Sequence, residues 1–182
     1  MTETVLRLPD ADATRAAGRA LATVLRAGDL VILTGDLGAG KTTLTQGIGA
    51  GLGVRGQVAS PTFIIAREHP ALARPDGTRG PDLVHVDAYR LGSLDEVEAL
   101  DLDSSLEESV TVVEWGAGWV EALAADRLEI ALTRPRGAPG VDDLDDGGAG
   151  ERVVTVRGRG PRWADVDLAD VLRVAAPDGV AG

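Results

Sequence analysis

Lys41 is the only lysine of this 182-residue chain, and it lies in an octapeptide whose residue types and spacing suit phosphate binding. Residues 35–42 read GDLGAGKT and fit the pattern G-x-x-x-x-G-K-[ST] at every fixed position. The glycines of such a loop let backbone N–H groups turn toward phosphate oxygens, and the lysine reaches the β- and γ-phosphates as a compact charge. Thr42 supplies a hydroxyl for Mg²⁺. The pattern predicts a nucleoside triphosphate site.

Two carboxylates, Asp87 and Glu114, end apolar runs of strand length. Parallel strands bring their carboxyl ends to one edge of the sheet, where the glycine loop also lies. Phosphate-loop hydrolases need an acid there to hold Mg²⁺ or its waters, and a group that orients the attacking water. The alternative is that each acid is a solvated strand end or a helix cap. The pair beside the loop favours the functional interpretation.

Three further residues have a functional and a simpler structural interpretation. Thr62 follows Pro61 after the loop helix, where switch regions place a threonine near the γ-phosphate or Mg²⁺, although a turn threonine would look the same. Trp115 follows Glu114 and could be ordinary core filling. His85, inside its strand, is interpreted as a structural histidine rather than a ligand.

The elements that must position these residues follow from hydrophobic periodicity. A buried strand over 30–34 and a helix over 43–52 bracket the glycine loop, which is the context that the phosphate-loop pattern requires. The other predicted elements are a helix over 12–26, a strand after Pro61, a helix start at Ser93, strands over 83–87, 110–115, 127–133 and 151–156, and a C-terminal helix over 163–174. Surface loops are expected over 70–82 and 134–150, the second Pro/Gly-rich and acidic.

These elements predict an α/β fold formed by one domain over 1–182. It has a mostly parallel central sheet flanked by helices, with antiparallel C-terminal strands, as in phosphate-loop NTPases.

Composition narrows the classes of protein further. The chain has no cysteine and a net charge of −11, and no apolar run approaches the roughly 18 residues of a membrane span. We therefore expect a cytoplasmic protein without a membrane partner. An acidic chain is poorly suited to direct nucleic-acid binding, because that needs a clustered cationic face. The arginine-rich segment 152–162 is interpreted as a strand with a solvated turn.

The absence of a second lysine disfavours one class of nucleotide site. Guanine-specific GTPases recognise the base with an [NT]-K-x-D motif, whose lysine this chain cannot supply because Lys41 already serves the phosphate loop.

Four motifs in order resemble the TsaE family of bacterial ATPases. They are GDLGAGKTT at 35–43, SPTF at 60–63, HVDAYR at 85–90 and VEW at 113–115. The resemblance covers most of the chain from about Pro9 to Val156. It implies an ATP-binding protein with weak ATPase activity in the biosynthesis of threonylcarbamoyladenosine, the modified adenosine next to the anticodon. It also implies action with TsaD and TsaB, and contact with tRNA only through that complex.

The resemblance implies roles residue by residue. Thr42 and Glu114 would hold Mg²⁺, Asp87 would lie near the γ-phosphate or a metal-bound water, and Thr62 would be the switch threonine. Trp115 would support Glu114. The residues implied around the nucleotide are Leu37, Gly38, Ala39, Gly40, Lys41, Thr42, Thr43 and Arg152.

Two other functions remain open. One is a nucleotide-dependent binding switch in which ATP only orders a docking surface. The other is a small-molecule kinase, which would need a lid with arginines over the phosphates. Only the loops over 70–82 and 134–150 are long enough to form that lid.

Overall fold

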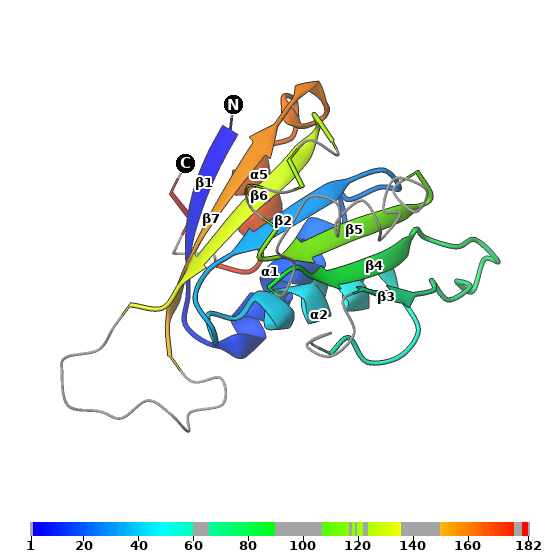
Figure 1. The fold of residues 1–182 in the computed structure, drawn as a ribbon, viewed down its shortest axis with the longest axis horizontal. Coiled ribbons are helices and arrows are strands. Elements are labelled where there is room, and N and C mark those ends of the chain that lie inside the picture. Colours follow the sequence, from blue (N-terminus) through cyan, green and yellow to red (C-terminus); the bar gives the residue numbers. More distant parts are fainter. Residues whose placement is uncertain are drawn as a thin grey trace.

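The computed structural model describes residues 2–59, 66–89, 107–116, 118, 120–121, 124–135, 150–176 and 180–181. Within these residues, eight strands form a single mixed sheet (Figure 1). The strand order is β3-β4-β5-β2-β6-β7-β1-β8. The bounds are β1 Thr2–Leu8, β2 Leu30–Thr34, β3 Ala66–His69, β4 Asp82–Asp87, β5 Ser109–Glu114, β6 Arg127–Thr133, β7 Arg152–Arg159 and β8 Val180–Ala181.

The centre of the sheet is parallel and both flanks are antiparallel. β4, β5, β2 and β6 run parallel, whereas β3 pairs antiparallel with β4, and β7, β1 and β8 continue antiparallel from β6. This arrangement confirms the predicted fold class, including the antiparallel C-terminal strands. Because β1 and β8 pair, the two ends of the chain lie side by side in Figure 1.

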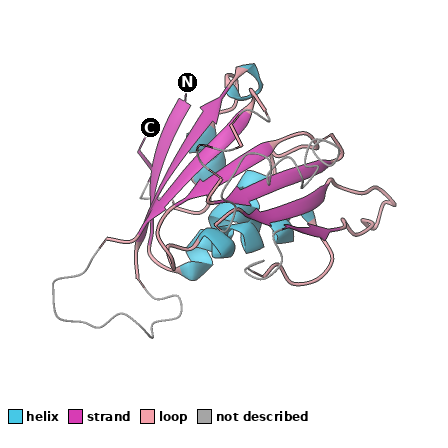
Figure 2. Cartoon of the chain, in the orientation of Figure 1, coloured by secondary structure: helices cyan, strands magenta, loops and turns pink. Residues whose placement is uncertain are grey.

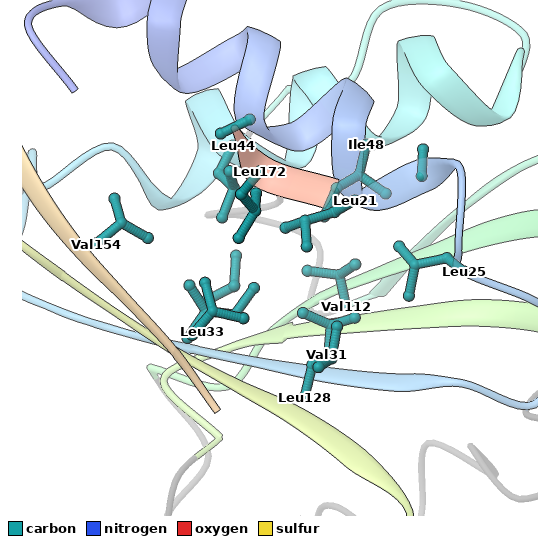
Figure 3. Packing of buried hydrophobic residues seen from close by; sticks show 14 of the residues in the cluster. Leu21, Leu25, Val31, Leu33, Leu44, Ile48, Val112, Leu128, Val154 and Leu172 are labelled. Atoms are coloured by element: carbon teal, nitrogen blue, oxygen red, sulfur yellow. The ribbon is translucent and has the colours of Figure 1, made fainter. Parts of the chain in front are cut away.

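In the part of the chain that the structure describes, three α-helices pack on one face of the sheet, as the cartoon in Figure 2 shows. They are α1 Ala11–Ala22, α2 Lys41–Leu52 and α5 Leu168–Leu172. Their apolar side chains meet alternate residues of the strands, because successive strand residues point to opposite faces (Figure 3). In β2, for example, Val31 and Leu33 face the helices, while Leu30 and Ile32 join a second cluster on the other face.

Helices α1 and α2 cross at glycines, which brings their backbones unusually close. A Cβ added to Gly47 would lie 2.2 Å from the carbonyl oxygen of Arg15, and one added to Gly18 would lie 2.3 Å from that of Leu44. Because α2 begins at Lys41, this crossing also anchors the helix that carries the phosphate-loop lysine.

We expect Gly47→Ala to lower the free energy of unfolding by about 1–3 kcal/mol, because the new methyl group meets backbone that cannot give way. This loss should appear even though alanine favours a helix by about 1 kcal/mol over glycine. Urea unfolding measures it, with Ala50→Ser at an exposed position of the same helix as the control. An unchanged or higher midpoint would mean that the helices separate at no cost.

Several boundaries differ from the predictions. The helix expected over 12–26 ends at Ala22, and the strand expected over 151–156 continues to Arg159. β1 and β8 are not among the predicted elements. The helix start at Ser93 and most of the loop over 134–150 lie outside the described residues.

The C-terminal helix predicted over 163–174 is wrong in extent. The segment forms a 3₁₀ turn, η1 Pro161–Trp163, followed by the five-residue α5. Trp163 is fully buried, and the guanidinium of Arg162 bonds Val24 O at 2.6 Å and Asp29 Oδ2 at 3.0 Å. These contacts hold the turn against the rest of the fold, and Asp167 caps a new helix start.

The arginine-rich segment 152–162 forms β7 and its following turn, as predicted. Three of its arginines are occupied by ion pairs with acids of other elements: Arg157 with Glu3, Arg159 with Glu129, and Arg162 with Asp29. Paired arginines on an acidic chain do not make the cationic face that nucleic acid requires.

Candidate functional site

The glycine loop lies between β2 and α2, and two of its glycines are required by the backbone. Gly35 has φ of 142°, and a Cβ there would lie 2.2 Å from the carbonyl oxygen of Leu132 on β6. Gly40 has φ of 106° and immediately precedes the first residue of α2. Left-handed backbone at these places favours glycine, which has no Cβ to clash. The loop therefore lies at the amino end of α2, where N–H groups and the helix dipole attract anions.

Lys41 is buried, and its ammonium group has no carboxylate contact among the described residues. Its Nζ donates to the carbonyl oxygens of Gly35 at 2.8 Å and Asp36 at 3.0 Å, and it lies 4.0 Å from the ring centroid of Trp115. Burial lowers the pKa of Lys41, and the charges of Glu114, Asp87 and Asp36 oppose that shift. The ammonium group is bound to neutral oxygens and an aromatic face, which a phosphate could replace with a stronger, charged partner.

Thr42 and Glu114 are brought together from α2 and the end of β5. The Thr42 hydroxyl donates to Glu114 Oε1 at 3.0 Å, and the carboxylate is only 3% exposed. The Nε2 of His85 on β4 donates to the same oxygen at 2.8 Å. The hydroxyl and carboxylate that the sequence analysis paired as metal ligands are therefore in direct contact.

Asp87 lies beside Glu114, because the two residues are register partners in the parallel β4–β5 pair. It is 9% exposed, and its Oδ1 accepts the backbone N–H of Tyr89 at 3.0 Å. One carboxylate oxygen thus caps the turn after β4, which is the structural role considered for it. The charge of Asp87 still reaches Lys41. The expectation that both acids meet the phosphate loop at one sheet edge is confirmed, while their chemical roles stay predictions.

Trp115 has a left-handed backbone that is rare for a residue other than glycine. Its φ is 63°, and its ring lies over the Lys41 ammonium group. The ring also meets Tyr89 edge-on, with centroids 5.4 Å apart, and Tyr89 is largely exposed. Backbone strain of this kind persists where surrounding contacts hold it, and functional sites are common places for it. Trp115 therefore contacts the loop lysine rather than only filling the core.

Arg152, the first residue of β7, lies beside Gly40 of the phosphate loop. It is 2% exposed, and its Nε would lie 3.4 Å from a Cβ on Gly40. Burial lowers the pKa of Arg152, Arg134 adds repulsion, and Asp10 opposes the shift. A buried cation beside the amino end of α2 suits an anionic ligand.

The other site residues predicted from the sequence differ in their exposure to solvent. Leu37 is 91% exposed at the tip of the loop, Gly38 is exposed, Ala39 is buried, and Thr43 lies half-buried in the first turn of α2. Thr62 lies outside the described residues, as do 60–65 in full. Its predicted switch role stays a prediction.

His85 is the residue whose contact the sequence analysis missed. It was interpreted as structural, yet it bonds the site carboxylate. Strand residues two apart share a face, so its position two before Asp87 was a signal that both side chains point to the same side of the sheet.

A family model for the threonylcarbamoyl adenosine biosynthesis protein TsaE matches residues 8–138. A Streptomyces coelicolor protein named tRNA threonylcarbamoyladenosine biosynthesis protein TsaE is 59% identical over 156 residues, covering 85% of this chain and 97% of that protein. A Bacillus subtilis protein of the same name is 39% identical over 129 residues, covering 70% and 76%. The crystal structure of Bacillus subtilis YdiB superposes with a TM-score of 0.64 at 31% identity, covering 94% of each chain.

Proposed function

The chain belongs to the TsaE family of threonylcarbamoyl adenosine biosynthesis proteins, and from this premise we propose that it acts there as a Mg²⁺-dependent ATP-binding protein with weak ATPase activity. One observation carries the proposal. The phosphate-loop lysine, the Thr42 hydroxyl and the carboxylates of Glu114 and Asp87 converge at one edge of the sheet. Cation, hydroxyl and acids in this arrangement are the parts that phosphate-loop hydrolases use.

The residues present fit Mg²⁺ bound together with a nucleotide. The described residues contain no cluster of three or more His, Cys, Asp or Glu that could hold a metal. Mg²⁺ usually binds through one or two protein oxygens plus substrate phosphates and water, rather than in an all-protein cage. The contacting oxygens of Thr42 and Glu114 supply that number. When bound, Mg²⁺ would draw negative charge from the phosphate oxygens.

Each side chain then has one task. Lys41 exchanges its loop carbonyl contacts for the β- and γ-phosphates, while the N–H groups at the start of α2 bind the remaining phosphate oxygens. Asp87 orients the attacking water with the carboxylate oxygen that does not cap the turn. Arg152 adds positive charge beside Gly40.

The partners proposed are TsaD and TsaB, with tRNA held by that complex. An acidic chain in which Arg157, Arg159 and Arg162 already form ion pairs is suited to docking on proteins rather than on nucleic acid. None of the described helices combines the length and apolar character needed to cross a membrane.

The loop over 70–82 argues against the kinase alternative. Its backbone is bonded to the carboxyl end of α2, with Leu72 N donating to Gly53 O at 2.9 Å and Arg55 N donating to Pro70 O at 2.7 Å. The phosphate loop lies at the other end of this 12-residue helix, about 18 Å away. This loop therefore does not provide an arginine lid over the phosphates.

The test is reconstitution with TsaD, TsaB, tRNA and a threonylcarbamoyl donor. We expect modification beyond one tRNA per complex only when this chain and hydrolysable ATP are both present, and not with Lys41→Ala. The matched control is Arg173→Ala, which removes an exposed cation outside the site. Multiple turnovers at the full rate without the chain would contradict the proposed function.

A further inference from the structure

His85 is completely buried on the helix-facing side of β4, yet it uses only one ring nitrogen. Its Nε2 donates to Glu114 Oε1 at 2.8 Å, and its Nδ1 has no hydrogen-bond partner among the described residues. A buried polar atom without a partner destabilises the fold, because it has lost its hydrogen bonds to water. An apolar side chain beside Leu83 and Val112 would avoid that cost. The one thing that histidine adds at this position is the bond to Glu114.

That bond acts on a carboxylate that is shared with the phosphate loop. Glu114 Oε1 accepts from two elements, the Thr42 hydroxyl at the start of α2 and the His85 ring on β4. Both bonds end on Oε1, so neither engages Oε2. Thr42 lies at the start of α2, next to the phosphate loop that would bind the nucleotide. His85 lies on β4, in the interior of the sheet. A hydrogen bond from a rigid ring in the sheet interior keeps the Glu114 carboxylate in one orientation even when the phosphate loop changes conformation.

We propose that His85 is a positioning residue, whose Nε2–H holds the Glu114 carboxylate in the orientation in which it meets Thr42 and receives Mg²⁺. This inference rests on the proposed ATP site. The contact also assigns the ring its tautomer: the proton is on Nε2, and Nδ1 carries the lone pair. The chain has only two histidines, so ring nitrogen signals can be assigned with one variant.

His69 offers a matched control. It is also buried, its Nε2 also has no partner among the described residues, and it lies on the neighbouring strand β3. Its ring interacts with the backbone of Arg55 and with the charges of His85 and Arg67. A histidine-to-methionine change at either position removes a buried ring with one unpartnered nitrogen, but only the change at His85 removes a bond to the site.

The experiment compares ATP binding by calorimetry with and without Mg²⁺. The quantity measured is the Mg²⁺ concentration at which the Mg²⁺-dependent increase in ATP affinity is half complete. His85→Met should raise this concentration by about 10- to 100-fold, the usual effect of losing a residue that hydrogen-bonds to a metal ligand. Binding without Mg²⁺ should change less than about 2-fold. His85→Gln, whose amide N–H can stand where Nε2–H stood, should restore most of the Mg²⁺ dependence, and His69→Met should leave it unchanged. Nitrogen-15 spectra should show the Nε2–H tautomer.

Different failures have different meanings. A parent chain without Mg²⁺-dependent ATP binding would overturn the proposed function and this inference together. A parent that binds Mg²⁺-ATP, with a His85→Met variant of unchanged Mg²⁺ dependence, would overturn the role of His85 alone. If His85→Met lowered the melting temperature without changing the Mg²⁺ dependence of ATP binding, the role of His85 would be purely structural. Should His85→Met fail to fold, His85→Asn replaces it, because its shorter amide cannot reach Oε1 and should lose what His85→Gln keeps.

Discussion

Lys41→Ala should weaken ATP binding by about 30- to 3,000-fold. Loss of one partner from a buried, hydrogen-bonded charge pair costs about 2–5 kcal/mol, and each 1.4 kcal/mol is about tenfold in affinity. Among the described residues, the ammonium group bonds the neutral carbonyls of Gly35 and Asp36 and contacts the face of Trp115, with three acids contributing attraction from further away. A triphosphate would give this ammonium group a direct anionic partner. Isothermal calorimetry with ATP and Mg²⁺ measures the effect.

The chain offers a clean comparison for that variant because it has no other lysine. Arg173→Ala changes the net charge equally at an exposed position and should bind ATP as the parent does. Lys41→Arg should recover only part of the affinity, because a planar guanidinium does not occupy the place of a compact ammonium group. If Lys41→Ala bound ATP as tightly as the parent, the phosphate-loop assignment would be wrong.

Glu114→Gln should reduce ATP hydrolysis by at least about 100-fold and remove most of its Mg²⁺ dependence. Positioned acid–base and metal-holding groups contribute on this scale. The amide keeps the size of the side chain and can still accept from Thr42 or His85, so the loss would report the carboxylate charge rather than a collapsed site. Binding of ATP without Mg²⁺ should persist, because removing a negative charge near Lys41 does not weaken its hold on phosphate. Phosphate release and calorimetry separate the two effects.

The same variant decides between hydrolysis and switching. In the reconstituted reaction, Glu114→Gln should support at most one round of tRNA modification if hydrolysis resets the complex. Continued turnover with ATP bound but not hydrolysed would instead favour the binding-switch alternative, in which ATP only orders a docking surface. Hydrolysis at the parent rate by this variant would remove Glu114 from the proposed mechanism.

The part of the site that could be predicted from sequence is the part made by neighbouring residues. The run 30–34, the glycines after it and the helix that begins at Lys41 form a continuous strand–loop–helix unit, and the structure reproduces it. Asp87 and Glu114 were placed correctly because a parallel sheet delivers strand ends to one edge regardless of detail.

Two strands and the length of the C-terminal helix could not be predicted from such local patterns. β1 carries an alternating pattern, with Thr4, Leu6 and Leu8 buried, but it precedes the motifs and was not interpreted. β8 has two residues, too few for any periodic signal. The C-terminal helix was predicted too long because the contacts of Arg162 with Val24 and Asp29 are distant in sequence.

The glycine-loop motif, the two strand-end acids and the family could be predicted from the amino-acid sequence alone, because these reside in short contiguous motifs. The contacts of Trp115 with the Lys41 ammonium group and of His85 with Glu114 became visible only in the tertiary structure. Those contacts depend on which strands are neighbours and in what register, since β5 lies between β2 and β4. Strand order is set by the packing of the whole sheet against its helices, and no local pattern of residues encodes it.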